Sequence, residues 1–391
     1  MRQGTRAPFI INIRHAQPIW IGHILSPFSL NHFLHIIPLP FQIRNINFMN
    51  LASKKSPKIS LGKTCLLVFT FWGAFLSFNT VSAEEKMANE KFTFMSNWFP
   101  EAEHGGFYQA IATGLYKKYG LDVTIKTGGP SVNVIQLMAA GQADCVMGGS
   151  DLQMIQVREA GVPVVNVAAI FQKDPQVIIT HEDVTNLNQL KTKTLLIVPF
   201  ARQGFWPWMK TTFDLRDEQT KPYTFNIQPF IADKNVAQQG YLTSEPYSIQ
   251  KAGGKANVFL LSELGYPAYS TTITCLDKTI ANRKTAVAAF VKASVEGWRS
   301  YLINPAPGNA LIKKENPDMT DDQLNYSIAK LKEKGIITSG DASKLGIGII
   351  TDQRAKASFD MMVNYKIIDP SKVKVSDTYT TEFVKDLHIL P

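Results

Sequence analysis

The sequence of 391 residues has no acidic residue among its first 83 positions, although eight Lys and Arg residues lie there. This stretch carries almost all of the net charge of +9, because 33 basic and 32 acidic residues follow Ala83. A strongly basic protein would suggest nucleic acid or an anionic membrane as its partner. The nearly neutral remainder gives no electrostatic reason to expect nucleic acid binding.

Sequence motifs of the common enzyme classes are missing as well. The chain has no P-loop, no G-x-S-x-G turn, no H-E-x-x-H motif and no C-x-x-C pair. After Ala83 only His104, His181 and His388 remain, and they are too scattered to suggest a metal centre. The sequence therefore predicts a protein that is not an enzyme and that uses no metal and no cofactor.

Cysteine is scarce, and after Ala83 only Cys145 and Cys275 are present. Two cysteines in a chain of this length do not make a disulfide scaffold. Both lie in apolar runs that we expect to form neighbouring strands. Because adjacent strands rarely place two sulfur atoms in bonding geometry, the sequence predicts two free, buried thiols.

Residues 49–83 have the pattern of a cleaved secretion signal. Four lysines precede an uncharged apolar run at residues 64–78, and the small residues 81–83 are spaced for signal-peptidase cleavage. The apolar run is shorter than the ~20 residues of a spanning helix, which favours cleavage over a retained membrane anchor. Residues 1–48 show no clean periodicity, and we interpret them as a misassigned upstream extension.

From residue 91 onward, strand-like runs alternate with helical patterns. This rhythm predicts an α/β fold with mostly parallel sheets flanked by helices. It restarts after His181, and the C-terminal part is mostly helical. We therefore expect a two-lobed clamp, with residues 91–181 and 270–391 in the first lobe and residues 182–269 in the second. A ligand would occupy the cleft, beyond the carboxyl ends of the strands.

The loop after the first predicted strand is rich in aromatic side chains. Trp98 and Phe99 offer flat apolar walls for a planar ligand, while Asn97 and His104 supply hydrogen bonds. The alternative is ordinary packing of these side chains beneath the loop.

A second group of candidates follows later strands. Gly149 permits close backbone approach, and Ser150 caps the next helix, although a tight turn without a ligand has the same pattern. In the second lobe, Arg202 can meet an anionic group and Trp206 can cover a ring; the alternative places Arg202 in solvent and Trp206 in the core. Glu245 can accept from a ring amino group or pair with a cation, unless it is a surface carboxylate.

Three stretches resemble periplasmic solute-binding proteins of ABC importers: NWFPEAEHGGFYQAIATGLYKKYGLDV (97–123), LMAAGQADCVMGGSD (137–151) and QQGYLTSEPY (238–247). The similar group includes nitrate, sulfonate and taurine binders, the binder of thiamine pyrimidine precursors, and eukaryotic thiamine pyrimidine synthases. The resemblance covers roughly residue 91 to the C-terminus. It implies the type II-like clamp of periplasmic binding proteins and a pocket lined by Asn97, Trp98, His104, Tyr108 and Glu245.

This resemblance implies a monomeric periplasmic protein that delivers a small polar solute to permease and ATPase subunits in the inner membrane. Thiamine pyrimidine precursors fit the aromatic walls and Glu245, whereas sulfonates or nitrate would require Arg202 and helix N-termini.

Two alternatives have other functions: a thiamine pyrimidine synthase-like enzyme, or a ligand-sensing module of a membrane kinase. The synthase members look to have a cysteine-rich iron-binding run in the returning segment, where this chain has STTITCLDK with the single Cys275. They also use a pyridoxal cofactor inside the cell, whereas this chain carries an export signal.

We expect export to remove the leader. The composition changes at Ala83, so N-terminal sequencing of periplasmic material should begin at Glu84. A mature protein that keeps residues 49–83 in the membrane would contradict cleavage.

Overall fold

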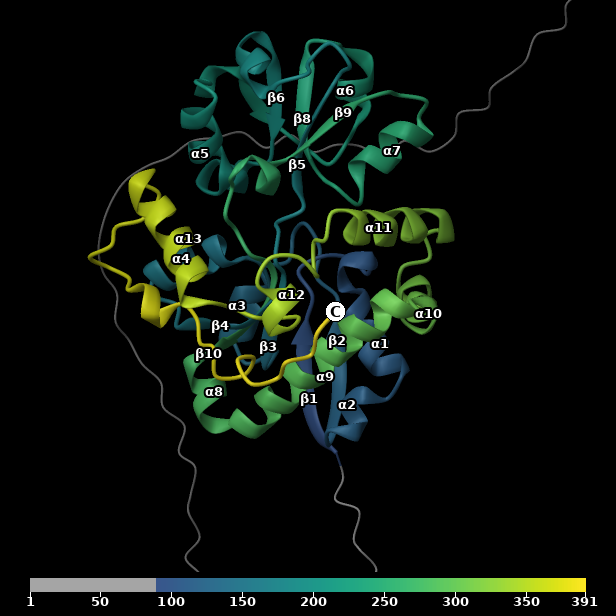
Figure 1. The fold of residues 1–391 in the computed structure, drawn as a ribbon, viewed down its shortest axis with the longest axis vertical. Helices are drawn as coiled ribbons and strands as arrows, with labels where there is room; N and C mark the ends of the chain where they lie inside the picture. The colour runs from purple at the N-terminus through teal and green to yellow at the C-terminus, as the bar shows by residue number, and fades with distance from the viewer. Residues whose placement is uncertain (1–88) are drawn as a thin grey trace, which may run out of the picture. The chain divides into compact units, whose positions relative to one another are not determined.

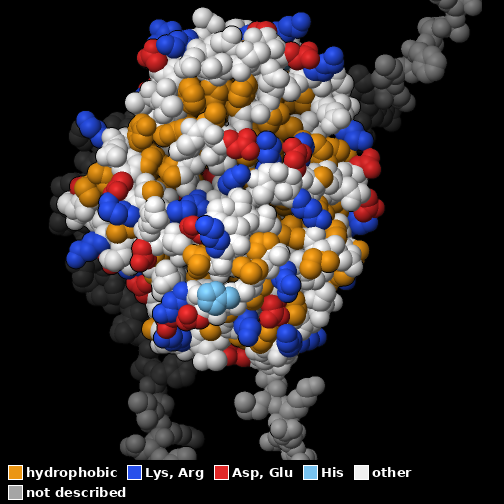
Figure 2. Space-filling model, in the orientation of Figure 1, with side chains coloured by type: hydrophobic (Ala, Val, Ile, Leu, Met, Phe, Trp, Pro, Cys, Tyr) orange, Lys and Arg blue, Asp and Glu red, His pale blue; other side chains and the backbone are white. Residues whose placement is uncertain are grey.

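The computed structural model describes residues 89–391 (Figure 1). The predicted secretion signal at 49–83 and the upstream extension at 1–48 lie outside the described residues. Figure 2 shows acidic and basic side chains intermixed over the visible face, in keeping with the nearly balanced charge after Ala83.

The described chain forms two five-stranded sheets, each with its own helices. The first sheet, in the spatial order β2-β1-β3-β10-β4, consists of β1 (Glu90–Met95), β2 (Leu121–Lys126), β3 (Cys145–Ser150), β4 (Val164–Phe171) and β10 (Ser270–Leu276). The second sheet, in the order β7-β6-β8-β5-β9, consists of β5 (Gln176–Thr180), β6 (Thr194–Ile197), β7 (Thr220–Pro222), β8 (Val236–Tyr241) and β9 (Asn257–Leu260). We call these sheets with their helices the first and the second lobe.

Both sheets are mixed in the same way. In the first, β10 runs antiparallel to β3 and β4, while the other pairs are parallel. In the second, β5 runs antiparallel to β8 and β9, and β6 pairs in parallel with β7 and β8. Each sheet therefore has four strands in one direction and one opposed strand, which confirms the predicted two-lobed α/β clamp.

Helices cover the sheets and extend the first lobe at the C-terminus (Figure 1). They are α1 (Gly105–Ala112), α2 (Leu115–Lys118), α3 (Val134–Ala139), α4 (Asp151–Glu159), α5 (Phe205–Thr212), α6 (Gln228–Ala232), α7 (Glu245–Lys251), α8 (Asp277–Asn282), α9 (Lys284–Ile303), α10 (Ala306–Glu315), α11 (Asp321–Glu333), α12 (Ala342–Leu345) and α13 (Asp352–Asn364). No helix within residues 89–391 is long and apolar enough to cross a membrane.

The close contact between α1 and α9 fixes the loop that precedes α1. A Cβ atom on Gly106 would lie 2.1 Å from the ring of Trp298, so only glycine allows this approach. Trp298 and Phe290 are fully buried on α9, and Phe290 stacks on Phe92 of β1 with ring centroids 4.6 Å apart. The helix therefore joins the start of α1 to the first sheet.

The strand β5 corrects the predicted lobe boundary. We expected the chain to leave the first lobe near His181, but Gln176–Thr180 already pairs with β8 and β9 in the second sheet. The crossing therefore lies between Phe171 and Gln176. Two apolar strands separated by a short polar stretch do not show which sheet each one joins, because that depends on partners distant in sequence.

The prediction of two free thiols is wrong, because Cys145 and Cys275 form a disulfide. The two residues lie directly opposite each other on β3 and β10, with Cα atoms 4.3 Å apart. This is the short spacing of an antiparallel pair that exchanges no backbone hydrogen bonds. The neighbouring strands were predicted correctly, but the register that brings the sulfur atoms together was not.

Removal of this disulfide should destabilise the protein. The bond spans a sequence separation of 130 residues, which includes the entire second sheet. The bond restricts the conformations open to the unfolded chain. We therefore expect the Cys145→Ala/Cys275→Ala variant to lose about 2–4 kcal/mol of unfolding free energy. Urea unfolding of both proteins measures this loss. Alkylation of both cysteines in denatured but unreduced wild-type protein would show that the bond is absent.

Candidate functional site

The loop between β1 and α1 reaches from the first lobe to the second. The ring of Trp98 lies 5.0 Å from the ring of Phe225, between centroids. Glu103, also in this loop, accepts a hydrogen bond from the hydroxyl of Thr243, which follows β8. Trp98 is half-buried and the side chain of Phe99 is 50% exposed, so both remain available at the lobe boundary.

Aromatic rings continue from Trp98 to a carboxylate in the second lobe. Phe225 lies 5.5 Å from Tyr223, and the Tyr223 hydroxyl donates to Glu245 Oε1 at 3.1 Å. The backbone N–H of Tyr241 donates to Glu245 Oε2 at 2.7 Å. We call Trp98, Phe225, Tyr223 and Glu245 the aromatic row. It presents ring faces followed by an oriented carboxylate, which suits a planar molecule with a polar edge.

Three carboxyl groups share this boundary, and we call Glu101, Glu103 and Glu245 the acidic trio. Burial raises the pKa of Glu101 well above its usual range, and repulsion from the other two carboxylates raises it further. Burial likewise raises the pKa of Glu103 to about 7 and also raises that of Glu245. Burial is the largest cause of each of these pKa shifts, while hydrogen bonds from Thr243 and Tyr223 lower the pKa values of Glu103 and Glu245. The trio therefore disfavours an anion and favours a hydrogen-bond donor or a cation.

His104 closes the loop and is buried. Its Nδ1 accepts from the backbone N–H of Glu101 at 3.2 Å, while Nε2 is buried with no hydrogen-bond partner in the described chain. Burial lowers the pKa of His104 to about 3, so the ring is neutral at physiological pH. Since Nδ1 accepts, the proton lies on Nε2, where it is available as a donor.

Asn97 and Gly149 come together from neighbouring strands. The Asn97 Oδ1 atom is buried without a hydrogen-bond partner in the described part of the chain. A Cβ atom on Gly149 would lie 3.7 Å from Asn97 Nδ2 and 2.7 Å from Gln153 Oε1, so glycine leaves space here. Ser150 accepts from the backbone N–H of Gln153 at 3.2 Å and caps α4. An unsatisfied amide oxygen beside a glycine is therefore available for a ligand donor.

Three predicted site residues bond to partners within their own lobe and not at the lobe boundary. Tyr108 is fully buried on α1 and donates to Glu315 of α10 at 2.6 Å. Trp206 is 2% exposed, and its Nε1 donates to Asp217 at 2.7 Å. Arg202 is exposed and donates to Thr220 within the second lobe. Helix packing thus directs Tyr108 and Trp206 into the lobes.

Four residues at this boundary were not among the predicted site residues: Glu101, Glu103, Tyr223 and Phe225. Glu101 and Glu103 could have been recognised from the sequence, because carboxylates are uncommon among buried aromatic rings and two of them lie in this aromatic loop. Tyr223 and Phe225 gave no local signal, because they belong to a run that reads as a strand. Within residues 89–391, no group of three or more His, Cys, Asp or Glu side chains could hold a metal ion.

Residues 101–307 match the family described as NMT1/THI5 like. The chain belongs to this family. A formylaminopyrimidine-binding protein of Halalkalibacterium halodurans is 32% identical over 269 residues, which cover 66% of this chain and 78% of that protein. This NMT1/THI5-like chain also matches the Saccharomyces cerevisiae 4-amino-5-hydroxymethyl-2-methylpyrimidine phosphate synthase THI11, with 28% identity over 87 residues, but only across 22% of the chain and 25% of the enzyme.

A solved structure supports the fold of this NMT1/THI5-like protein. The periplasmic aliphatic sulphonate-binding protein SsuA of Escherichia coli aligns with a TM-score of 0.56 and 14% identity, covering 74% of this chain and 91% of that one. At this low identity the likeness establishes the two-lobed fold alone.

Glu103 should make the stability depend on pH. Its folded-state pKa of about 7 exceeds the ordinary value of 4.5, so the folded chain holds this proton more tightly than the unfolded chain. The stability it contributes is therefore complete below about pH 4.5 and is lost as the pH rises through about 7. We expect Glu103→Gln, which cannot ionise, to remove up to about 3 kcal/mol of this loss.

Urea unfolding of wild type and Glu103→Gln at about pH 5 and about pH 8 tests this dependence. The opposite contribution of His104, whose pKa is lowered, is present in both proteins and cancels in the comparison. The exposed Glu182→Gln is the matched control. Parallel pH profiles for wild type and Glu103→Gln would mean that Glu103 ionises normally.

Proposed function

We propose that this protein is the solute-binding component of an ABC importer and that its solute is a small planar ring carrying an amino group. Thiamine pyrimidine precursors belong to this class. The observation that carries the proposal is the position of Glu245, which ends the aromatic row and belongs to the acidic trio. The relative named as a formylaminopyrimidine-binding protein supports the same class of ligand.

The site residues divide the recognition of such a ring between the two lobes. Trp98 stacks on the ring face, and Glu245 accepts from the ring amino group in the orientation set by Tyr223 and Tyr241. Asn97 Oδ1 and His104 Nε2 supply a further acceptor and a donor from the first lobe. Because contacts come from both lobes, binding favours the closed arrangement.

Anionic solutes fit this site less well. Nitrate or a sulfonate would approach three carboxyl groups, and the candidate cation Arg202 is hydrogen-bonded to Thr220. The sulfonate-binding structure with the same fold therefore does not determine the ligand here, because fold and ligand chemistry vary independently.

A binding protein is also favoured over a synthase. The similarity to the yeast enzyme spans 22% of this chain, whereas the pyrimidine-binding relative spans 66%. The single cysteine of the returning strand, Cys275, is joined to Cys145 and offers no free thiol. A disulfide is typical of an oxidising compartment, which supports periplasmic delivery of the solute to a permease and ATPase. We propose that the protein acts as a monomer.

Substitution of Glu245 should weaken binding and leave the fold intact. Glu245→Gln keeps the shape but removes a charge-assisted hydrogen bond, which corresponds to roughly 1.5–3 kcal/mol, or about ten- to a hundredfold in affinity. Trp98→Ala should also weaken binding through lost stacking area. Calorimetric titration with aminopyrimidines, taurine and nitrate measures both effects.

The exposed Glu182 in the same lobe provides the control, since Glu182→Gln makes the same chemical change away from the aromatic row. Wild-type affinity in Glu245→Gln, or tight binding of nitrate or taurine, would refute the aminopyrimidine proposal.

A further inference from the structure

The chain crosses between the lobes twice. Residues 172–175 connect β4 to β5, and residues 265–269 lead from the short helical turn Leu261–Leu264 to β10. A change in the angle between two lobes is absorbed by a few residues in such connections. A side chain that holds both connections at once would therefore control lobe movement.

Arg354, on α13, contacts both connections. Its Nη2 donates to the carbonyl of Gln172 at 2.7 Å and to the carbonyl of Pro267 at 3.2 Å. Its Nη1 donates to Gln172 Oε1 at 3.2 Å. The guanidinium carbon also lies 3.9 Å from the ring centroid of Tyr269. One planar cation thus joins residues 172–175, which lead to the second lobe, to residues 265–269, which lead back to the first.

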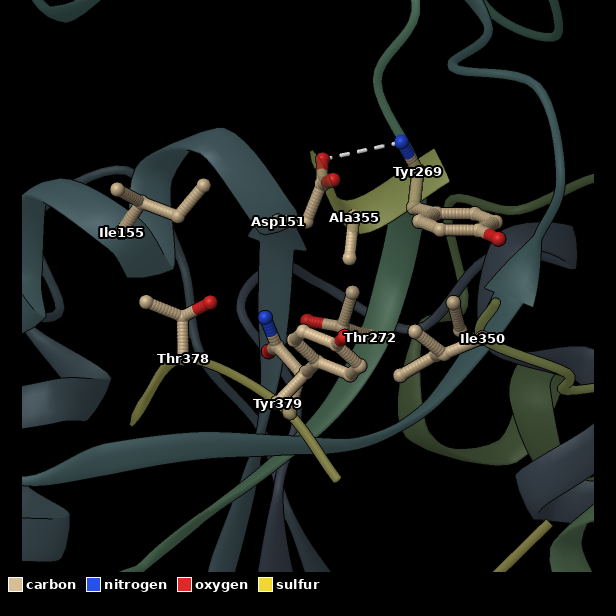
Figure 3. A pocket seen from close by; sticks show the side chains of 10 residues that line it. Asp151, Ile155, Tyr269, Thr272, Ile350, Ala355, Thr378 and Tyr379 are labelled. Carbon is tan, nitrogen blue, oxygen red and sulfur yellow. Dashed lines mark hydrogen bonds between the residues drawn. The ribbon is translucent and has the colours of Figure 1, made fainter. Parts of the chain in front are cut away.

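The partners of Arg354 are themselves held by the first lobe. Gln172 Nε2 donates to the carbonyls of Ala169 and Ile349, at 3.0 and 2.9 Å. The backbone N–H of Tyr269 donates to Asp151 Oδ1 at 3.0 Å. Asp151, Tyr269 and Ala355 line a small cavity of about 10 Å³, and Figure 3 shows how these side chains lie. Asp151 follows Gly149 and Ser150 directly, so residues 265–269 are tied to the end of β3 beside Asn97.

Backbone strain lies next to this contact. Thr271 has φ of 48°, a conformation that a β-branched residue rarely adopts. It lies between Ser270 and Thr272, which both pair with β3 and β4 in an unbroken register. Strained residues persist only where surrounding contacts hold them. The contacts around Tyr269 supply this restraint at the point where the chain re-enters the first sheet.

We propose that Arg354 is a positioning residue that holds both connecting segments and thereby favours the arrangement in which the lobes touch. That arrangement places Trp98 against Phe225 and Glu103 against Thr243. The consequence for ligand affinity rests on the proposed function, whereas the effect on lobe movement does not. Weaker restraint lets the lobes separate, which lowers the fraction of molecules able to bind.

The test is Arg354→Lys, which keeps the charge but replaces the planar fork of two donor nitrogens, Nη1 and Nη2, with a single nitrogen. Arg158→Lys is the matched control, because Arg158 is also half-buried and donates to a backbone carbonyl, that of Val164, but lies away from the connections. Spin labels on Ser131→Cys and Lys221→Cys, which are exposed in different lobes, report the distance between the lobes. Because Cys145 and Cys275 are joined, they do not take up label.

In ligand-free protein, we expect Arg354→Lys to shift the distance distribution to longer values and the control to match wild type. A distribution equal to that of wild type overturns the proposal. Arg354→Gln should shift it further, and circular dichroism establishes that each variant is folded. A purely structural role would lower the unfolding midpoint without moving the distances in the folded protein.

Ligand binding provides a separate measurement. With 4-amino-5-hydroxymethyl-2-methylpyrimidine as the probe, we expect Arg354→Lys to bind about tenfold more weakly than wild type, because fewer molecules are able to bind. Unchanged affinity in Arg354→Lys despite a distance shift would overturn the link to binding. No binding of this probe by wild type would contradict the proposed function, and the distances would still decide the role of Arg354.

Discussion

The acidic trio is the constraint that gives this boundary its chemical character. Buried carboxyl groups that repel one another retain protons at unusually high pH. Such an arrangement lowers the stability of the fold unless a ligand or the other lobe supplies hydrogen-bond donors. Thr243 supplies one donor to Glu103, and Tyr223 and Tyr241 supply two to Glu245. The remaining acceptor capacity is open to a ligand, which explains why the site favours donors over anions.

The rest of the fold keeps these groups in place. The contact of Gly106 with Trp298 fixes the start of α1, and with it the loop that carries Glu101 and Glu103. On the other side of the boundary, Glu245 is the first residue of α7 and is held by a backbone N–H of β8. The lobes are joined by two short connections, and the disulfide lies in the first lobe, where the chain returns. The site is therefore assembled by two rigid parts whose relative position depends on a few residues.

Several features could be predicted from sequence because they depend on local patterns. The alternation of strands and helices, the returning strand at Ser270–Leu276 and the cap at Ser150 are all read from neighbouring residues. The proximity of Trp98 to the second lobe followed from its place at the carboxyl end of β1. The orientation of Tyr108 and Trp206 could not be predicted in this way. An aromatic residue on a helix points into a pocket or into the core according to the rotation of the helix, which sequence spacing determines only approximately.

The sequence by itself determined the α/β class, the restart of the pattern in a second lobe, and the aromatic loop at residues 97–104. These follow from composition and periodicity, which act over a few residues at a time. Tertiary structure alone decided that β5 joins the second sheet, that Cys145 faces Cys275, and that Glu101 and Glu103 meet Glu245. Each of these depends on strand order and register between segments far apart in the chain, and a displacement of one residue turns a side chain to the opposite face of its sheet.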